Sequence, residues 1–221
     1  MTNVVRTMLE NMYDLFQREY LDAYQAWDNM VAFIAGDYSL DYIWQNKDSL
    51  KSLLEKKTLM DKVMNVYDHT ILKNDYYDHL GDLYLEKIVS SNTAKQRGQF
   101  VTPHAVGSMM SRMIIPKTEK KITILDPAVG SGRLLMEAYK QAPNSIPFGV
   151  DLDLRMVRIA MTNFVIHGIK GYLLHANSLE HELDLSKQDG IHNWRYANKW
   201  ESHIGELKTI SHGENLELNL R

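Results

Sequence analysis

The segment 126–132, with the sequence DPAVGSG, places an aspartate before two glycines that are one residue apart. Glycines let a ligand approach the backbone closely, and a helix that begins after them offers unpaired N–H groups. Asp151 follows the next apolar run, where an acidic side chain can accept both hydroxyls of a ribose. These residues indicate a site for a nucleoside-containing ligand, although the glycines alone are equally typical of a tight strand-to-helix turn. Asp153 is interpreted as the cap of the following helix.

Strands and helices must alternate to bring the turn and Asp151 to one edge of a sheet. Short β-branched and apolar runs predict buried parallel strands, and apolar residues spaced by three and four predict helices between them. The expected strands cover residues 122–125, 147–150 and 171–175, and the expected helices cover 133–140 and 154–165, the second of them stopped by Gly168. This order predicts an α/β fold with a parallel sheet and right-handed crossovers.

The segments on either side of this sheet have other patterns. Apolar residues recur at three and four from Val5 to Ile34, which predicts a helix broken near Gly36. A second helical pattern follows Asp48 or Ser49, with one apolar side made of Leu50, Leu53, Leu54, Leu59, Val63, Met64 and Tyr67. The runs 207–211 and 216–220 alternate as two strands of a hairpin would. We therefore expect a helical domain over residues 1–95 and an α/β domain over residues 96–221.

The composition excludes several classes of function. The 221 residues are 44% hydrophobic and 24% charged, which suffices for a folded core. The absence of cysteine excludes disulfides, thiolate zinc sites and cysteine nucleophiles, and the scattered histidines predict no metal site. No apolar run has the length of a membrane span and no N-terminal segment is typical of a signal peptide, so a soluble, cytoplasmic protein is expected. The net charge of −3 predicts weak DNA contact by the lone chain.

From residue 75 to about 180 the chain resembles the N6-adenine DNA methyltransferases of the type I modification-subunit kind. The segment 124–132 resembles the first S-adenosylmethionine motif of that family. The segment 97–103 (RGQFVTP) is similar to its Gly-Gln-Phe-Tyr-Thr-Pro signature, and 78–84 (DHLGDLY) is similar to the helix that precedes this signature. Residues 149–151, 160–163 and 167–169 resemble the second motif and its helix.

The resemblance implies a Rossmann-like class I methyltransferase sheet, incomplete in this sequence, and S-adenosylmethionine as the cofactor. It implies three groups of cofactor-binding residues, one for the amino-acid end, one at the glycine turn and one for the nucleoside. They are Phe100, Thr102 and Pro103; Asp126, Ala128, Gly130 and Gly132; and Asp151, Leu152 and Asn177. Asn177 stands where the family usually has Asp, and its amide oxygen can still meet the adenine amino group. Val101 and Val129 depart from the family's Tyr and frequent Cys, and each removes a polar atom near the ligand.

Catalysis in this family needs an Asn/Asp-Pro-Pro-Tyr/Phe motif, which accepts the amine hydrogens of a flipped adenine. The prolines of this sequence are at positions 103, 116, 127, 143 and 147, so no such motif follows Asn177. Asn198 and Trp200, in the segment 196–200 (YANKW), are the nearest substitutes, but an ordinary amphipathic segment is the favoured interpretation. The open side of the first strand also needs a cover, either the C-terminal hairpin or another subunit.

Three hypotheses of function follow. In the first, the chain binds S-adenosylmethionine but is inactive alone, and acts through its cofactor or as a member of a modification complex or a homodimer. In the second, it is an active N6-adenine methyltransferase that uses Asn198 and Trp200 or is completed by a partner chain. In the third, it is an interaction module without a cofactor. Cofactor binding separates the third hypothesis from the others, and methyl transfer to DNA separates the first two.

Overall fold

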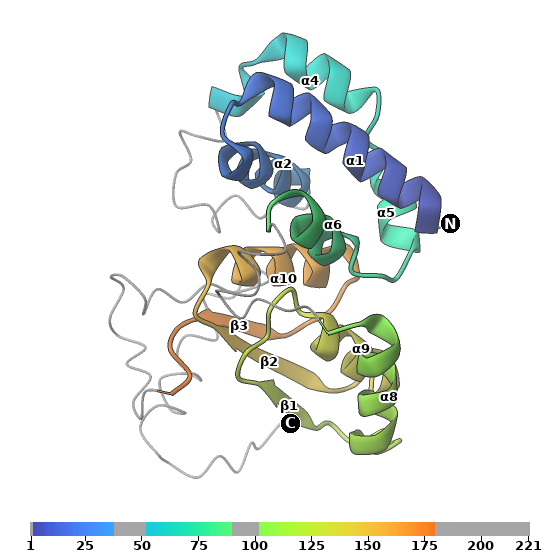
Figure 1. Cartoon of the computed structure of the whole chain (residues 1–221). Coiled ribbons are helices and arrows are strands. Elements are labelled where there is room, and N and C mark those ends of the chain that lie inside the picture. The colour runs from blue at the N-terminus through green and yellow to red at the C-terminus, as the bar shows by residue number, and fades with distance from the viewer. Residues whose placement is uncertain (1, 38–51, 90–101, 180–221) are drawn as a thin grey trace.

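The computed structural model describes residues 2–37, 52–89 and 102–179. In these residues N-terminal helices stack on one helix that in turn covers a parallel sheet, while two further helices lie at one end of that sheet (Figure 1). The elements are α1 (Thr2–Glu19), α2 (Ala23–Asp37), α4 (Lys57–Met64), α5 (His69–Asn74), α6 (His79–Lys87), α8 (His104–Ile114), β1 (Thr123–Asp126), α9 (Arg133–Gln141), β2 (Ile146–Asp151), α10 (Leu154–Ile166) and β3 (Tyr172–His175). The expected α/β class is confirmed.

The first helical segment has a break at residues 20–22 that the sequence did not predict. The chain leaves the helix at Tyr20 and re-enters it at Ala23, and α2 then runs through Gly36. Leu21 is 99% exposed, and the Asp22 carboxylate accepts a hydrogen bond of 2.7 Å from the Gln25 N–H at the start of α2. A capping aspartate therefore starts a new helix at Ala23. α2 ends at Asp37, next to the predicted break at Gly36, and the residues that follow lie outside the described ranges.

The second helical pattern is also interrupted. The chain leaves the helical conformation at Glu55 and Lys56, before α4 begins. Leu53, Leu59 and Val63 are buried as predicted, whereas Leu54 and Met64 are exposed. Two short helices cannot share one continuous apolar stripe, which explains why part of the predicted side faces outward. Within the described ranges, no helix combines the length and the apolar character needed to cross a membrane.

The sheet has the order β1-β2-β3, and both pairs of strands are parallel, as the strand–helix alternation predicts. Asp126 at the end of β1 pairs with Gly149, and Asp151 at the end of β2 pairs with His175. β1 forms one edge of this described sheet. Leu125 is 63% exposed, so the prediction of a buried first strand is wrong. The neighbouring Ile124 packs against the core from the opposite face, because successive strand residues alternate.

α10 is the central helix of the described structure, since it lies between the sheet and the N-terminal helices (Figure 1). It is buried on nearly all sides, which is typical of a helix with apolar residues all round. It ends where Gly168 adopts a φ of +66°, as the sequence predicts. The expected division at residues 95 and 96 falls between α6 and α8 in the segment 90–101, which lies outside the described residues and leaves the division a prediction. The expected C-terminal hairpin also lies outside them.

Candidate functional site

The glycine turn joins β1 to α9 and has two distinct glycine positions. Gly130 has a φ of +54° and Gly132 a φ of +88°, a region that L side chains rarely adopt. A Cβ on Gly130 would meet no atom within 4 Å, so this glycine borders open space. A Cβ on Gly132 would lie 3.1 Å from the Cβ of Ala160 in α10. Gly130 therefore leaves room for a ligand, whereas Gly132 allows the turn to pack on α10.

Asp126 ends β1 with one of its carboxylate oxygens unused. Its Oδ1 accepts a hydrogen bond of 3.1 Å from the Ala128 N–H. Its Oδ2 is buried and has no hydrogen-bond partner among the described residues. Burial raises the pKa of Asp126, the charge of Asp151 acts in the same direction, and the Ala128 N–H opposes both. A buried carboxylate oxygen of this kind is suited to receive a cationic group.

Asp151 ties the end of β2 to the glycine turn. Its Oδ2 accepts a hydrogen bond of 2.8 Å from the Gly130 N–H, and its Oδ1 accepts one of 2.8 Å from the Asp153 N–H. Burial raises the pKa of Asp151, although these two N–H groups act against it. Each oxygen keeps a second lone pair, so ribose hydroxyls can still donate to it. Asp153 accepts from the Arg155 N–H and caps α10, which confirms its predicted role.

The end of β3 lies beside the end of β2. The Ala176 N–H donates to the Asp151 carbonyl oxygen over 3.0 Å, which places Asn177 next to this strand end. The side-chain oxygen of Asn177 accepts a hydrogen bond of 3.1 Å from the Leu179 N–H. Leu152 follows Asp151 and is exposed. The predicted nucleoside residues are thus brought together at the carboxyl edge of the sheet, where parallel α/β sheets bind their ligands.

The residues predicted for the amino-acid end are only partly described. Pro103 occupies the N-cap position of α8 and is exposed, and Thr102 precedes it. The Thr102 carbonyl oxygen accepts a hydrogen bond of 2.9 Å from Nη1 of Arg133, the first residue of α9. This contact links the segment before α8 to the glycine turn. Phe100, Asn198 and Trp200 lie outside the described residues.

Sequence reasoning missed the polar residues behind the turn. Asp78, Arg133 and Asn163 are buried together with Ser131, and hydrogen bonds connect all four. A signal was present in the sequence, because Asn163 is an amide in a helix whose other positions are mostly apolar. Buried amides are usually hydrogen-bonded, so a partner had to exist.

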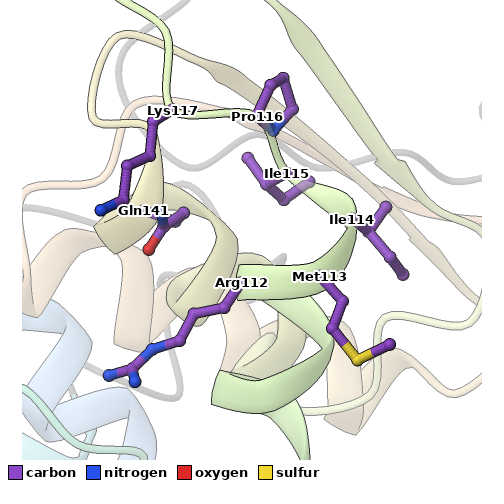
Figure 2. Close-up of a pocket in the computed structure, with 7 residues that line it drawn as sticks. All are labelled: Arg112, Met113, Ile114, Ile115, Pro116, Lys117 and Gln141. Carbon is purple, nitrogen blue, oxygen red and sulfur yellow. The ribbon is translucent and has the colours of Figure 1, made fainter.

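A surface depression that could also be considered for a ligand lies elsewhere. It has a volume of about 730 Å³ and is lined by the end of α8, the segment that follows it and Gln141 at the end of α9 (Figure 2). This segment leads into β1, so the depression lies toward the amino ends of the strands. Because ligands of parallel α/β sheets bind at the carboxyl ends, the depression is not the cofactor site.

The parallel sheet, the glycine turn and the acidic strand ends together define a class I methyltransferase fold. A solved structure from Listeria monocytogenes, described as a class I S-adenosylmethionine-dependent methyltransferase, aligns with a TM-score of 0.56. The two are 18% identical, and the alignment covers 81% of this chain and 54% of that chain. The chain belongs to the N-6 DNA methylase family, whose family model matches residues 75–214. The family and the fold imply S-adenosylmethionine as the cofactor.

Several curated proteins are similar to this chain. The type I restriction enzyme MjaVIII methylase subunit of Methanocaldococcus jannaschii is 30% identical over 119 residues, which cover 52% of this chain and 20% of that protein. The EcoEI methylase subunit of Escherichia coli is 27% identical over 131 residues, with coverages of 53% and 26%. The uncharacterized protein YtxK of Bacillus subtilis is 25% identical over 160 residues, with coverages of 68% and 43%. The chain therefore spans less than half the length of each of these relatives.

Proposed function

We propose that this chain supplies the S-adenosylmethionine site of an N6-adenine DNA methyltransferase. The observation that carries the proposal is the buried, unpaired Oδ2 of Asp126, beside a turn at which Gly130 borders open space. A buried anionic oxygen without a partner costs free energy, and a bound cation removes that cost. The ammonium group of S-adenosylmethionine is a cation of suitable size, and the family membership of the chain supports the same ligand.

In this proposal, the ligand lies along the carboxyl edge of the sheet. Asp126 accepts from the ammonium group, Gly130 lets the backbone approach, and Asp151 accepts from the ribose hydroxyls. Leu152 would flank the adenine, and Asn177 would accept from its amino group. Asn177 can do so only if its oxygen is shared with the Leu179 N–H, because that oxygen already accepts one hydrogen bond.

The remaining proposed residues complete the amino-acid end and the turn. Phe100, Thr102 and Pro103 would enclose the amino-acid end, with Pro103 at the start of α8. Ala128 contributes the N–H that fixes the Asp126 carboxylate. Gly132 would affect cofactor binding indirectly, because the lack of a side chain lets the turn pack closely against α10.

The bound cofactor supplies a methyl group on a positively charged sulfur, which an exocyclic amine can attack. The described residues bind and orient this donor. The carboxylate of Asp126 would hold its ammonium group and the carboxylate of Asp151 would hold its ribose, which would restrict the movement of the methyl donor. Such positioning supplies much of the rate of a transfer reaction, because a misplacement of about 1 Å can cost about a hundredfold.

We further propose that the 221-residue chain alone does not methylate adenine at a rate typical of the family. No proline follows Pro147 in its sequence, so a turn preset to present an amide and a carbonyl to the same amine is missing from it. Its net charge of −3 adds a second obstacle, because duplex binding depends on clustered cations. Two of the similar proteins are methylase subunits of type I restriction enzymes, which supports action within an assembly of the restriction-modification kind. A homodimer is the alternative assembly.

The binding proposal is tested by calorimetric titration of the purified chain with S-adenosylmethionine. We expect Asp151→Ala to weaken binding by about tenfold to a hundredfold, the usual loss for a charged acceptor. Asp153→Ala is the matched control, because it removes the neighbouring carboxylate that caps α10 and should leave the affinity unchanged. Equal affinities of wild type and Asp151→Ala would refute the ribose assignment. No binding by wild type would favour an interaction module instead.

The catalytic proposal is tested by incubating the chain with tritium-labelled cofactor and adenine-containing duplex or single-stranded DNA. We expect no label above background in the DNA. Label incorporated by the lone chain and abolished by Asn198→Ala would overturn this proposal and assign catalysis to Asn198. Label that depends on an added methylase partner chain would support completion by a partner.

A further inference from the structure

A buried polar cluster, formed by Asp78, Ser131, Arg133 and Asn163, lies behind the glycine turn. Asp78 is 0% exposed and precedes α6, in the N-terminal part of the chain. The other members come from the turn, from the first residue of α9 and from α10. None of them is assigned to the cofactor above.

The carboxylate of Asp78 accepts four hydrogen bonds. Its Oδ1 accepts from the Gly81 N–H and from Nδ2 of Asn163, both at 2.7 Å. Its Oδ2 accepts from the Ser131 hydroxyl at 2.5 Å and from Nε of Arg133 at 3.1 Å. Since each carboxylate oxygen has two lone pairs, the acceptor capacity of Asp78 is filled by these donors.

The guanidinium of Arg133 extends this cluster to the segment before α8. Its Nη1 donates to the Thr102 carbonyl oxygen at 2.9 Å, while Nη2 donates to Asp82 at 2.5 Å. The Arg133 side chain is 5% exposed. A planar guanidinium can hold all these acceptors at fixed separations, which a lysine cannot do.

Gly81 shows how closely the parts of the cluster approach one another. A Cβ at this position would lie 2.2 Å from Oδ2 of Asp78 and 2.7 Å from the Ser131 hydroxyl oxygen. Only glycine fits there without displacement of the cluster. The segment 78–84, which resembles a family motif in sequence, is therefore shaped around the Asp78 carboxylate.

Burying an ion pair rarely stabilises a fold more than apolar packing would, so its geometry needs another explanation. We propose that Asp78 and Arg133 form a clamp that sets the separation between Thr102 and the glycine turn, and through it the fit of the amino-acid end of S-adenosylmethionine. Both are positioning residues, since they act through the turn and Thr102. This inference rests on the proposed function, because it assumes that the ligand lies between those two segments.

The clamp has a consequence for ligand selectivity. The nucleoside end is assigned to Asp151, Leu152 and Asn177, at the carboxyl ends of β2 and β3, whereas the clamp lies between Thr102 and the start of α9. Loosening the clamp should therefore weaken S-adenosylmethionine more than 5′-methylthioadenosine, which keeps the nucleoside and lacks the amino-acid end. A merely structural role would weaken both ligands alike.

The experiment measures the dissociation constants of both ligands by calorimetry on the full chain. We expect Asp78→Asn to raise that of S-adenosylmethionine by about tenfold or more and that of 5′-methylthioadenosine by less than about threefold. Arg133→Lys keeps a cation but loses the fixed reach to Thr102, and should give the same selective loss if Asp78→Asn does not fold. Asp28→Asn is the matched control, because it breaks a different ion pair with α10 and should leave the ratio of the two constants unchanged.

The outcomes separate this inference from the proposed function. Equal weakening of both ligands in Asp78→Asn and Arg133→Lys would overturn the clamp while leaving the cofactor site in place. An unchanged ratio in both variants would overturn it as well. A wild-type chain that binds neither ligand would overturn the proposed function, and the clamp with it.

Discussion

The ion pairs Asp28–Arg155 and Asp78–Arg133 both join the N-terminal helices to the α/β part of the chain, and they lie in different surroundings. Asp28 of α2 pairs with Arg155 of α10 at 3.0 Å, with side chains 26% and 35% exposed. Asp78 pairs with Arg133 at 3.0 Å, with side chains 0% and 5% exposed. The outer pair can exchange its hydrogen bonds for water. The inner pair cannot, so every one of its polar atoms depends on protein partners.

The partners of the two pairs differ accordingly. Arg155 holds Asp28 through both carboxylate oxygens, and its guanidinium lies over the Tyr24 ring at 4.7 Å, all between α2 and α10. Arg133 instead contacts Thr102 and Asp82 as well as Asp78. The Asp28–Arg155 pair thus connects only the two helices α2 and α10. The inner pair connects three chain segments around the proposed cofactor site.

Removal of the inner carboxylate is expected to have the largest effect on stability. Asp78→Ala leaves the buried Arg133 with Asp82 as its remaining counter-ion, and it leaves the Asn163 amide with the Ser131 carbonyl oxygen as its remaining acceptor. Breaking a buried pair in this way typically costs about 3 to 5 kcal/mol of unfolding free energy. Urea unfolding followed by circular dichroism measures it. A loss below about 1 kcal/mol would mean that water replaces Asp78, and the contrast between the pairs would disappear.

The folding stability should also depend on pH through His167. This buried side chain packs on Tyr76 and contacts the Tyr77 carbonyl oxygen. Burial lowers the pKa of His167 to about 4, from an ordinary value of 6.5. Below pH 6.5 the unfolded chain binds a proton that the folded chain does not bind until about pH 4. Stability is therefore lost as pH falls across this window, by about 3 kcal/mol for this group.

His167→Phe isolates that contribution, because the ring contact is kept and the titration is removed. Burial also lowers the pKa of His79 and of His104, but both contribute equally to wild type and variant. We expect the free energy of unfolding to fall more steeply in wild type than in His167→Phe between pH 6.5 and pH 4. Parallel pH profiles would show that folding does not lower the pKa of His167.

The substitution Gly81→Ala tests how tightly the buried polar cluster around Asp78 is packed. Alanine normally stabilises a helix relative to glycine by up to about 1 kcal/mol. At Gly81 its Cβ would collide with Asp78, so we expect Gly81→Ala to destabilise by about 1 to 3 kcal/mol. Gly107 of α8 is the matched control, since its Cβ would lie 3.3 Å from Cδ2 of Leu134 and 3.7 Å from Cγ of Glu137, both in flexible side chains. If Gly81→Ala were as stable as Gly107→Ala, the cluster would have room to move.

The sequence predicted those features that depend on local pattern. Apolar runs and their spacing located the three strands, α9 and α10, and Gly168 marked the end of α10. The glycine turn and Asp151 fell at adjacent strand ends because parallel strands present their carboxyl ends on one edge. Their meeting through the Gly130 N–H follows from that register.

The features that were missed depend on contacts between distant segments. Asp78, Ser131 and Asn163 meet only because α6 and α10 pack behind the turn, and no spacing in the sequence encodes that meeting. The exposure of Leu125 depends on which elements cover each face of β1, which the strand's own pattern cannot tell. The helix break at Leu21 was missed for a different reason, since Tyr20 and Tyr24 continue the apolar period across it.

The smallest expected effect is at the outer ion pair. Asp28→Ala removes a partly exposed carboxylate, and water can solvate Arg155 in its place, so we expect a loss of about 0.5 to 1 kcal/mol. The double-mutant cycle with Arg155→Ala separates the pair energy from the lost contact with Tyr24, and its coupling energy should lie in the same range. A coupling energy as large as the loss in Asp78→Ala would show that partial exposure does not weaken the outer pair. The two ion pairs would then differ only in how many chain segments they connect, because Arg133 contacts Thr102 and Asp82 in addition to Asp78.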